Sequence, residues 1–392
     1  MLNFQICTPT NLVFGKDTQH QIGGLIKPLS TKVLLHYGGN SVKKIGLYDD
    51  AKKSLTDAGV DFVELGGVVP NPRLSLVYEG IELCKSTGVD FILALGGGSV
   101  IDSAKAIAAG VKYDGDVWDL YEGKAPLKDA LPVATVLTIP AAGSEMSGDT
   151  VISNMEKGRK LGIGGDILRP AVSIVNPEYF FSLPKHQLAY GVSDIISHIF
   201  ERYFTQTINC DITDGLCESV LRTVMKNAEI LLNDYTNYEA WAEVGLGGII
   251  AHNNWLGIGR QQDWASHNIE HELSAYNDVA HGAGLAVVTP AWMKYVCKEN
   301  MGMFVQFAVN VMGVDGSFRE PEAIVADGIA KLEAFYRKLG LGLTLRELGI
   351  DEDAFEDMAK KATGAYFGEE RGLGSFKTLV WQDVVEIFRL CK

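Results

Sequence analysis

Five side chains in the C-terminal half of the chain have the types and the spacing to bind a metal ion. Asp194 and His198 are four residues apart in GVSDIISHIFERY, and His267 and His271 are four residues apart in DWASHNIEHEL. His281 follows ten residues later in NDVAHGAG. Because residues four apart lie on one face of a helix, each pair could supply two ligands to one divalent cation. The sequence therefore predicts a metal centre in this half of the chain.

The alternative is that each pair belongs to an ordinary solvated or capped helix face. The chain has eight histidines, and half of them fall in this cluster. This concentration favours the metal centre. The spacing does not say which imidazoles are ligands and which lie behind them.

A glycine-rich turn in the N-terminal half has the form of a phosphate site. GGGSVIDSAK (96–105) follows an apolar strand pattern and opens a helical one. The backbone amides of Gly97, Gly98 and Ser99 would point out of a helix N-terminus, where anions bind. Asp102, in the first turn, is either a cofactor contact or only a cap or dipole partner. The turn matches neither the GxGxxG fingerprint nor a P-loop.

Two further loops could contact a nucleotide. In TIPAAGSEMSGDT (138–150), Thr138 and Ser144 could help to wrap a phosphate or a sugar. The first predicted strand ends at Gly38, Gly39, Asn40 and Ser41. A carboxylate usually binds the adenosine ribose at such a point, and this turn has none, whereas Asn40, Ser41, Lys43 and Lys44 could accept a 2′-phosphate. The turn therefore favours NADP, with NAD as the alternative.

The order of the predicted elements gives the fold class. Strand patterns at 32–39, 60–67, 89–98 and 132–140 alternate with helical patterns at 41–59, 71–88 and 99–110. This alternation predicts a doubly wound α/β domain with a parallel sheet over residues 1–182. Helical periodicity takes over beyond it, as in 321–340, and predicts an all-helical metal-binding domain over 183–392.

Composition excludes several classes of partner. The formal net charge is −14, and the acidic residues are dispersed, which argues against nucleic acid and anionic membrane surfaces. The apolar runs are too short to span a bilayer, and the N-terminus lacks the features of a signal peptide. The six cysteines have no CxxC spacing, which is typical of a protein in the reducing cytoplasm.

Several motifs together resemble the iron-containing (group III) alcohol dehydrogenases, and among them the butanol dehydrogenase-like branch. They are TPTNLVFG, YGGNSVKKIG, VPNP, LALGGGSVID, TIPAAGSE, GVSDIISHIFE and DWASHNIEHELSAYNDVAHGAGLAVVTP. Each is modest evidence alone, but their order and spacing are specific and cover nearly the whole chain. The resemblance implies the two-domain fold of the dehydroquinate synthase-like superfamily.

The resemblance also assigns roles. It implies Asp194, His198, His267 and His281 as ligands of one divalent metal, with Fe²⁺ expected and Zn²⁺ or Ni²⁺ as alternatives. It places His271 off the metal and beside the nicotinamide, either as a residue that supports the ligands from behind or as a proton relay. It implies hydride transfer between NAD(P)(H) and a small primary alcohol or aldehyde, by a homodimer or higher homo-oligomer. It implies cofactor contacts at Asn71, Gly97, Gly98, Ser99, Asp102, Thr138 and Lys160, with Gly38 to Ser41 by the adenosine ribose.

Three other readings make different predictions. A dehydroquinate synthase or glycerol dehydrogenase activity shares the design, but the synthase needs a basic pocket, and residues 252–271 contain one arginine and no lysine. A metal-dependent hydrolase would leave the two glycine turns without a role. A metal-sensing protein would bind metal without turning over a carbonyl.

Overall fold

The computed structural model describes residues 1–368 and 370–392, and the chain divides into two compact units. The sheet unit comprises residues 7–183 and 235–249. The helical unit comprises residues 1–6, 184–234 and 250–392. The chain thus passes from the sheet unit to the helical unit between Leu183 and Pro184, and it returns to the sheet unit for fifteen residues, 235–249.

The sheet unit is built on six parallel strands in the order β1-β8-β5-β4-β2-β3. The central strand β4 is buried along its full length, because the run FILALG has no polar side chain to place in water. This confirms the predicted parallel sheet. The strands are β1 (Asn11–Phe14), β2 (Lys32–Tyr37), β3 (Asp61–Leu65), β4 (Phe91–Gly96), β5 (Val133–Leu137) and β8 (Val172–Val175).

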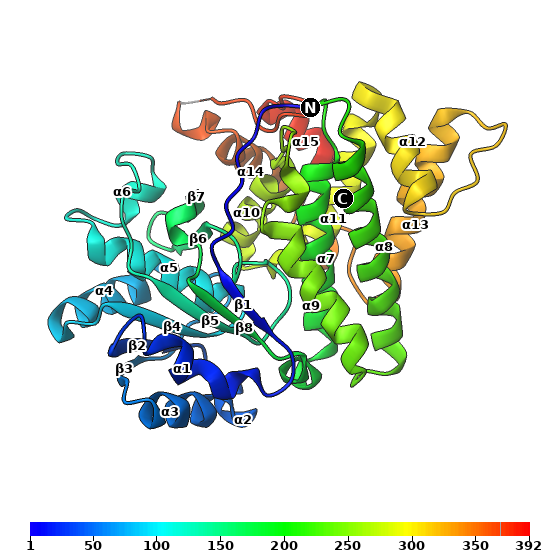
Figure 1. The fold of residues 1–392 in the computed structure, drawn as a ribbon. Coiled ribbons are helices and arrows are strands. Elements are labelled where there is room, and N and C mark those ends of the chain that lie inside the picture. Colours follow the sequence, from blue (N-terminus) through cyan, green and yellow to red (C-terminus); the bar gives the residue numbers. More distant parts are fainter. Residues whose placement is uncertain (369) are drawn as a thin grey trace. The chain divides into compact units, whose positions relative to one another are not determined.

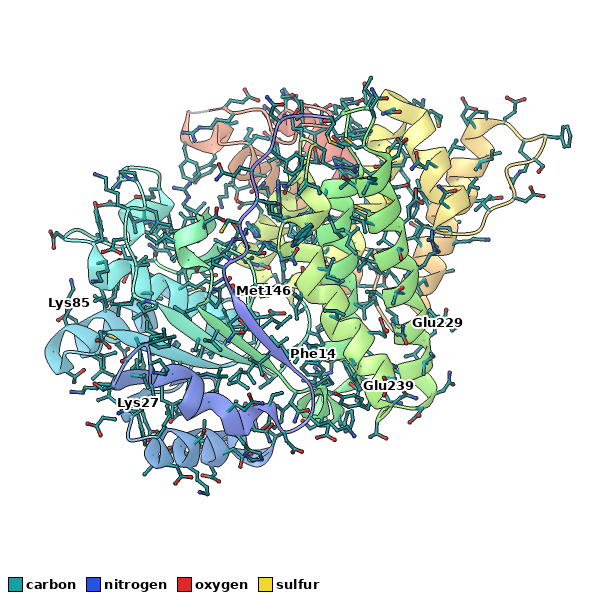
Figure 2. The ribbon with its side chains drawn as sticks, viewed as in Figure 1. Phe14, Lys27, Lys85, Met146, Glu229 and Glu239 are labelled. Atoms are coloured by element: carbon teal, nitrogen blue, oxygen red, sulfur yellow. The ribbon has the colours of Figure 1, made fainter. Side chains whose placement is uncertain are left out.

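Helices cover both faces of this sheet, with α1 and α3 on one face and α4 and α5 on the other (Figure 1). Charged side chains such as Lys27 and Lys85 point outward from this layer (Figure 2). The sheet is therefore doubly wound. The helices of the unit are α1 (Ile22–Ile26), α2 (Ser41–Lys44), α3 (Leu47–Asp57), α4 (Leu74–Thr87), α5 (Gly98–Lys112), α6 (Trp118–Tyr121) and most of α9 (Tyr238–His252).

An antiparallel hairpin adds to the sheet unit, and the sequence patterns did not predict it. Its strands β6 (Asp149–Asn154) and β7 (Arg159–Gly164) pair with each other and not with the main sheet. The hairpin packs against α5. Its first strand begins at Asp149, so the predicted loop 138–150 ends two residues earlier than expected, at residue 148.

Eight α-helices form most of the described part of the helical unit, and α7 lies at its centre. Residues 191–203 of α7 are all buried, and the helix packs against α8, α10 and α11. No helix of the described ranges has the length and apolar character needed to cross a bilayer. The helices are α7 (Lys185–Tyr203), α8 (Asp211–Asn233), α10 (Ala265–Asn277), α11 (His281–Val296), α12 (Met301–Asn310), α13 (Pro321–Lys338), α14 (Phe355–Ala362) and α15 (Trp381–Leu390).

Candidate active site

Three helices of the helical unit carry the residues predicted to bind metal. Asp194 and His198 lie one turn apart on α7, and each is only 4 % exposed. His267 lies in the first turn of α10, and His281 is the first residue of α11. Since α11 packs against both α7 and α10, the three helices bring these side chains to one place.

The imidazoles converge on one carboxylate oxygen, Oδ1 of Asp194. The Nε2 atoms of His198, His267 and His281 lie 3.3, 3.7 and 3.8 Å from it. Ligand atoms of Asp194, His267 and His281 all lie within 4.8 Å of one another. Donors about 2.0–2.1 Å from a tetrahedral metal would be separated by roughly 3.4 Å, so the observed spacing suits one ion.

Two buried polar atoms at this point have no hydrogen-bond partner. They are Oδ1 of Asp194 and Nε2 of His267. Buried polar groups in folded proteins are almost always satisfied, and leaving one unsatisfied costs about 1–3 kcal/mol. Three imidazole nitrogens and a carboxylate are suitable donors for Fe²⁺, Zn²⁺ or Ni²⁺. The residues present therefore fit the metal that the sequence predicts.

The protonation of two of these imidazoles is controlled by opposite effects. Burial, together with the neighbouring imidazole of His252, holds the pKa of His198 well below its ordinary value. Burial alone would also lower the pKa of His267, but the carboxylates of Asp194 and Glu201 raise it to about 9. Glu201 is the closer partner, since its Oε1 lies 2.8 Å from His267 Nδ1. A metal at Nε2 would displace the proton that this carboxylate environment retains.

His271 lies beside the cluster and belongs to a second grouping. It is half-buried on α10, with its ring centroid 5.6 Å from that of His281. Ligand atoms of Glu270, His271 and His281 also lie within 4.8 Å of one another. His281 is thus shared between the two groupings, and His271 is close enough to the ligands to exchange a proton near them.

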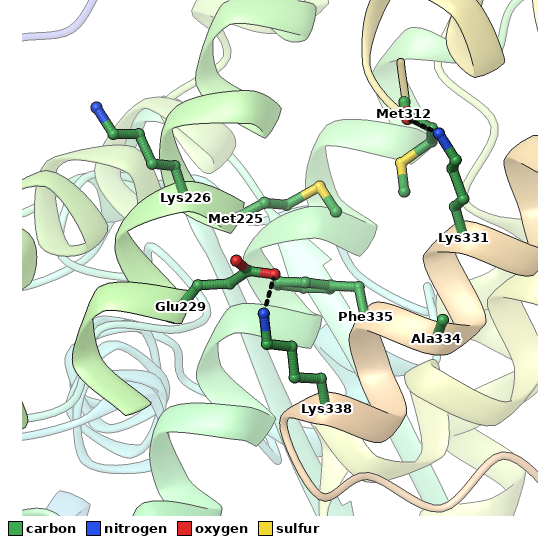
Figure 3. Close-up of a pocket in the computed structure, with 8 residues that line it drawn as sticks. All are labelled: Met225, Lys226, Glu229, Met312, Lys331, Ala334, Phe335 and Lys338. Atoms are coloured by element: carbon green, nitrogen blue, oxygen red, sulfur yellow. Dashed lines mark hydrogen bonds and ion pairs between the residues drawn. The ribbon is translucent and has the colours of Figure 1, made fainter. Parts of the chain in front are cut away.

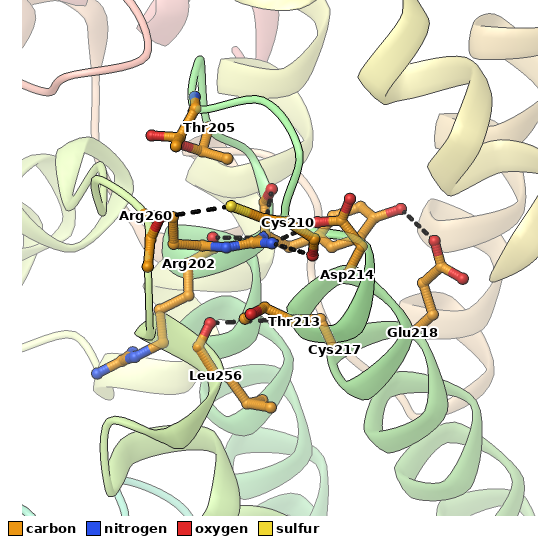
Figure 4. A network of polar contacts seen from close by, with 12 residues as sticks. Arg202, Thr205, Cys210, Thr213, Asp214, Cys217, Glu218, Leu256 and Arg260 are labelled. Atoms are coloured by element: carbon orange, nitrogen blue, oxygen red, sulfur yellow. Dashed lines mark hydrogen bonds and ion pairs between the residues drawn. The ribbon is translucent and has the colours of Figure 1, made fainter. Parts of the chain in front are cut away.

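A buried polar network holds the end of α7 to the segment that leads into α10. Arg260 Nη2 donates to Asp214 Oδ1 at 2.6 Å and to the carbonyl of Cys210 at 3.0 Å (Figure 4). Its Nη1 donates to the carbonyl of Arg202. The guanidinium of Arg202 lies over the ring of Trp264, 4.8 Å from its centroid. These contacts fix the residues just before His267.

A separate groove of the helical unit lies between α8, α13 and the loop after α12 (Figure 3). Two of its three lysines already have partners, because Lys338 pairs with Glu229 and Lys331 donates to the carbonyls of Met312 and Gly313. None of its lining residues is a predicted site residue. We assign it no part in the chemistry.

The glycine turn after β4 lies at the carboxyl edge of the sheet, at the N-terminus of α5. A Cβ at Gly97 would lie 3.1 Å from the side chain of Ile139, and a Cβ at Gly98 would lie 3.1 Å from Ala142. The turn therefore packs closely against the loop after β5. Gly97, Gly98 and Ser99 lie at the N-terminus of the fifteen-residue helix α5. The N-terminus is the end of a helix at which anions bind.

The loop from Thr138 to Ser144 lies beside that turn, since the amide of Thr138 donates to the carbonyl of Gly96. Asp102 is engaged within the protein. Its Oδ1 accepts from Ser144 Oγ at 2.6 Å, and its Oδ2 accepts from the amide of Val151 at 2.9 Å. A cofactor contact at Asp102 stays a prediction, and the contacts present give it a role in holding this loop to the hairpin.

The turn from Gly38 to Ser41 follows β2 at the same edge. An acidic side chain does lie near it, on the neighbouring strand β3, and the sequence patterns missed it. Glu64 accepts hydrogen bonds from Tyr48 at 2.6 Å and from Lys52 at 2.9 Å. The Nζ atom of Lys43 lies 4.8 Å from the ring centroid of Tyr48. Glu64 would have to release these partners to bind a ribose.

Asn71 and Lys160, which only the family resemblance indicated, are both buried in the sheet unit. Asn71 has a positive φ of 52° just before α4. The adjacent Pro72 accepts a hydrogen bond from the amide of Ser153, which pairs with Lys160 across the hairpin. The fold therefore brings these two segments together beside β6.

Comparison with known proteins decides the family. A family model described as iron-containing alcohol dehydrogenase matches residues 9–177, and one described as the C-terminal part of the Fe-containing alcohol dehydrogenase family matches residues 188–391. The chain belongs to the iron-containing alcohol dehydrogenase family. This confirms the predicted family, the dehydroquinate synthase-like fold and the oxidoreductase class.

Relatives of this alcohol dehydrogenase agree over their full length. An NADH-dependent butanol dehydrogenase A of Clostridium acetobutylicum is 42 % identical over 99 % of both chains. An NADPH-dependent aldehyde reductase of Escherichia coli is 35 % identical over 92 % of this chain and 93 % of that protein. The crystal structure of an NADH-dependent butanol dehydrogenase A from Thermotoga maritima superposes with a TM-score of 0.96 at 42 % identity, covering 100 % of this chain and 99 % of that one.

These comparisons make the chain a nicotinamide-dependent alcohol dehydrogenase and aldehyde reductase, and they do not favour the hydrolase or the synthase alternatives. Sequence reasoning overlooked three buried groups of this alcohol dehydrogenase that contact the predicted ligands: Glu201, Glu270 and His252. One signal was present, because each glutamate follows a histidine by three residues, in His198-Ile-Phe-Glu201 and His267-Asn-Ile-Glu270.

Proposed function

We propose that this alcohol dehydrogenase interconverts short primary alcohols and aldehydes at one divalent metal, Fe²⁺ or Zn²⁺, held by Asp194, His198, His267 and His281. The observation that carries the proposal is the convergence of three Nε2 atoms on the otherwise unpartnered Oδ1 of Asp194. When bound, the metal would polarise the substrate oxygen as a Lewis acid while the nicotinamide gives or takes the hydride.

Other residues of the chain keep a ligand neutral, exclude water and move the proton. The burial of His198 keeps its imidazole neutral, so that its lone pair is available to a cation. The ring of Trp264 packs against the rings of His267 and His198 at centroid distances of 5.3 and 5.8 Å and excludes water from that side. His271 gives a proton to the product oxygen in reduction and removes it in oxidation.

For the cofactor, we propose that both dinucleotides are accepted and that NADPH is preferred. The turn Gly38–Ser41 has no carboxylate, and Glu64 nearby is engaged by Tyr48 and Lys52. The exposed side chains of Asn40, Ser41 and Lys43 could instead bind a 2′-phosphate. The diphosphate would bind at Gly97, Gly98 and Ser99. One relative, at 42 % identity, is named as NADH-dependent, and another, at 35 % identity, is named as NADPH-dependent.

The test is an initial-rate panel. Butanal and shorter aldehydes are offered with NADPH or NADH to protein prepared with Fe²⁺, with Zn²⁺ or without metal. We expect nicotinamide oxidation only in the metal-loaded samples, with a higher kcat/KM for NADPH. Equal rates without metal would overturn the metal-dependent mechanism. A higher kcat/KM with NADH would overturn the cofactor preference alone, and no turnover of any aldehyde would overturn the proposed substrate class.

A further inference from the structure

Two of the three imidazoles that converge on Asp194 have a buried carboxylate at the other ring nitrogen, and the third packs against another imidazole. His267 Nδ1 lies 2.8 Å from Glu201 Oε1, and His281 Nδ1 contacts Glu270 Oε2. Nδ1 of His252 lies 2.8 Å from Nδ1 of His198 and 3.1 Å from its Nε2, and the two rings are nearly perpendicular. The arrangement with Nε2 toward the ligand oxygen and Nδ1 toward a partner therefore occurs twice, at His267 and at His281.

Glu201 is held rigidly in its position. It lies on α7, one turn beyond His198, and is 3 % exposed. Its Oε1 accepts from both the amide and the ring of His267, and its Oε2 accepts from the amide of Trp264 at 2.7 Å. One carboxylate thus fixes the start of α10 and the orientation of the His267 ring.

Glu270 is equally constrained. It is fully buried on α10, and its Oε1 accepts a hydrogen bond from Ser274 Oγ. That bond directs the other oxygen, Oε2, to His281. Gly284 makes room for this carboxylate, because a Cβ at Gly284 would lie 2.6 Å from Cγ of Glu270.

His252, the neighbour of His198, is an imidazole and not a carboxylate. It is 7 % exposed at the end of α9, and its ring centroid lies 4.0 Å from that of His198. Because its Nδ1 is close to both ring nitrogens of His198, it packs against that ring without selecting one of its tautomers.

We infer that Glu201 and Glu270 are positioning residues that orient the imidazoles of His267 and His281 and raise the affinity of the site for a divalent cation. A carboxylate behind an imidazole makes the ring a more basic ligand and fixes its tautomer. With Asp194, the two glutamates place three carboxylates around one buried site. The inference rests on the proposed ligand set, and its test separates the two.

The experiment measures Zn²⁺ affinity by competition with a chromophoric chelator, without substrate or cofactor. It compares the wild-type chain with Glu201→Gln, Glu270→Gln and a matched control, Glu218→Gln. Glu218 is also buried in the helical unit, but its partners are not proposed metal ligands. Its Oε1 accepts from Tyr203, Gln306 and Asn310, and its Oε2 lies 3.9 Å from Nη1 of Arg222. We expect Zn²⁺ affinity to fall about 10- to 100-fold in the first two variants and to stay at the wild-type level in the control.

Two further readouts distinguish positioning from general stability. The melting temperature of the chelator-treated protein should fall no more in the two site variants than in Glu218→Gln. The visible d–d spectrum of the Co²⁺-loaded protein should keep the wild-type coordination number, with shifted bands. If Glu201→Gln does not fold, Glu270→Gln carries the same comparison.

The outcomes separate the claims. Wild-type Zn²⁺ affinity in both glutamine variants would overturn the inference while leaving the ligand set intact. A lower Co²⁺ coordination number in Glu270→Gln would make Glu270 a ligand in its own right and also overturn it. If His267→Ala, measured in the same series, binds Zn²⁺ as tightly as the wild type, then the proposed ligand set itself has failed.

Discussion

At the scale of single residues, the two histidines of α10 are expected to have separable roles. His267→Ala should lose bound metal and turnover together, because it removes one of the donors facing Asp194 Oδ1. His271→Ala should retain metal and reduce kcat by about 10²- to 10⁴-fold, the usual loss for a general acid–base group. Metal analysis and initial rates on the same samples check both results. Loss of metal in His271→Ala would instead favour the second grouping, Glu270, His271 and His281.

A buried acid in the sheet unit should make stability depend on pH. Burial raises the pKa of Glu145 to about 7, and its Oε1 has no hydrogen-bond partner. Lys105, buried nearby, donates to the surrounding loop. A raised folded-state pKa means that the folded chain binds more protons between pH 4.5 and 7. This contribution to stability is therefore present below pH 4.5 and is lost as pH rises through 7.

Glu145→Gln should remove this loss. Its gain in stability over the wild type should be larger at pH 8 than at pH 5 by roughly 2–3 kcal/mol, because each unit of the pKa change is worth about 1.4 kcal/mol. Denaturant unfolding at the two pH values gives the difference, with the exposed Glu79→Gln as control. An offset that is the same at both pH values would show that Glu145 does not titrate in this range.

The sequence predicted the metal ligands better than it predicted the residues that contact those ligands from behind. The four-residue spacing of Asp194 and His198, and of His267 and His271, is a local property of helices, so it is visible in the chain. Glu201 contacts a ring 66 residues away, and His252 contacts one 54 residues away. The spacing of three residues places each glutamate near a histidine of its own helix, but which ring it contacts depends on how the helices pack, and that is not visible within one helix.

At the scale of elements, the metal cluster depends on a close approach between two helices. A Cβ at Gly282, in the first turn of α11, would lie 2.0 Å from the carbonyl oxygen of Tyr190 on α7. Gly282→Ala should force these helices apart and move the adjacent His281 away from Asp194. We expect a loss of at least about 2 kcal/mol in stability and weaker Zn²⁺ binding, measured by thermal unfolding and chelator competition.

Gly215→Ala is the matched control for that change. Gly215 also lies within a helix, α8, but its Cβ would meet nothing within 4 Å. Alanine there should stabilise the protein by about 0.5–1 kcal/mol and leave Zn²⁺ binding unchanged. If both alanine variants bind Zn²⁺ like the wild type, the α7–α11 contact does not set the position of His281.

The elements themselves were predicted where burial gives a strong local signal. The apolar run 89–98 contains β4, and the predicted strand at 132–140 contains β5. The edge strand β1 has only four residues, too few to show a periodic pattern, and β8 is equally short. The helix predicted over 41–59 is two helices, because Gly46 adopts a φ of 78° between α2 and α3.

At the scale of the whole molecule, the proposed metal site and the predicted cofactor site belong to different compact units. All four proposed metal ligands lie in the helical unit, and all twelve predicted cofactor residues lie in the sheet unit. Metal binding should therefore stabilise the first unit directly. A ligand present at a thousandfold excess over its Kd stabilises the state it binds by about 4 kcal/mol.

Hydrogen exchange can locate that stabilisation. On removal of metal with a chelator, amides of α7, α10 and α11 should exchange faster, because the ion no longer links their side chains. Amides of β4 and β5 should keep their wild-type rates, since their protection comes from the buried parallel ladder. Matching acceleration in the sheet would mean that the ion stabilises the molecule as one cooperative body. Acceleration in the sheet alone would place the ion at a different site from the one formed by Asp194 and the three imidazoles.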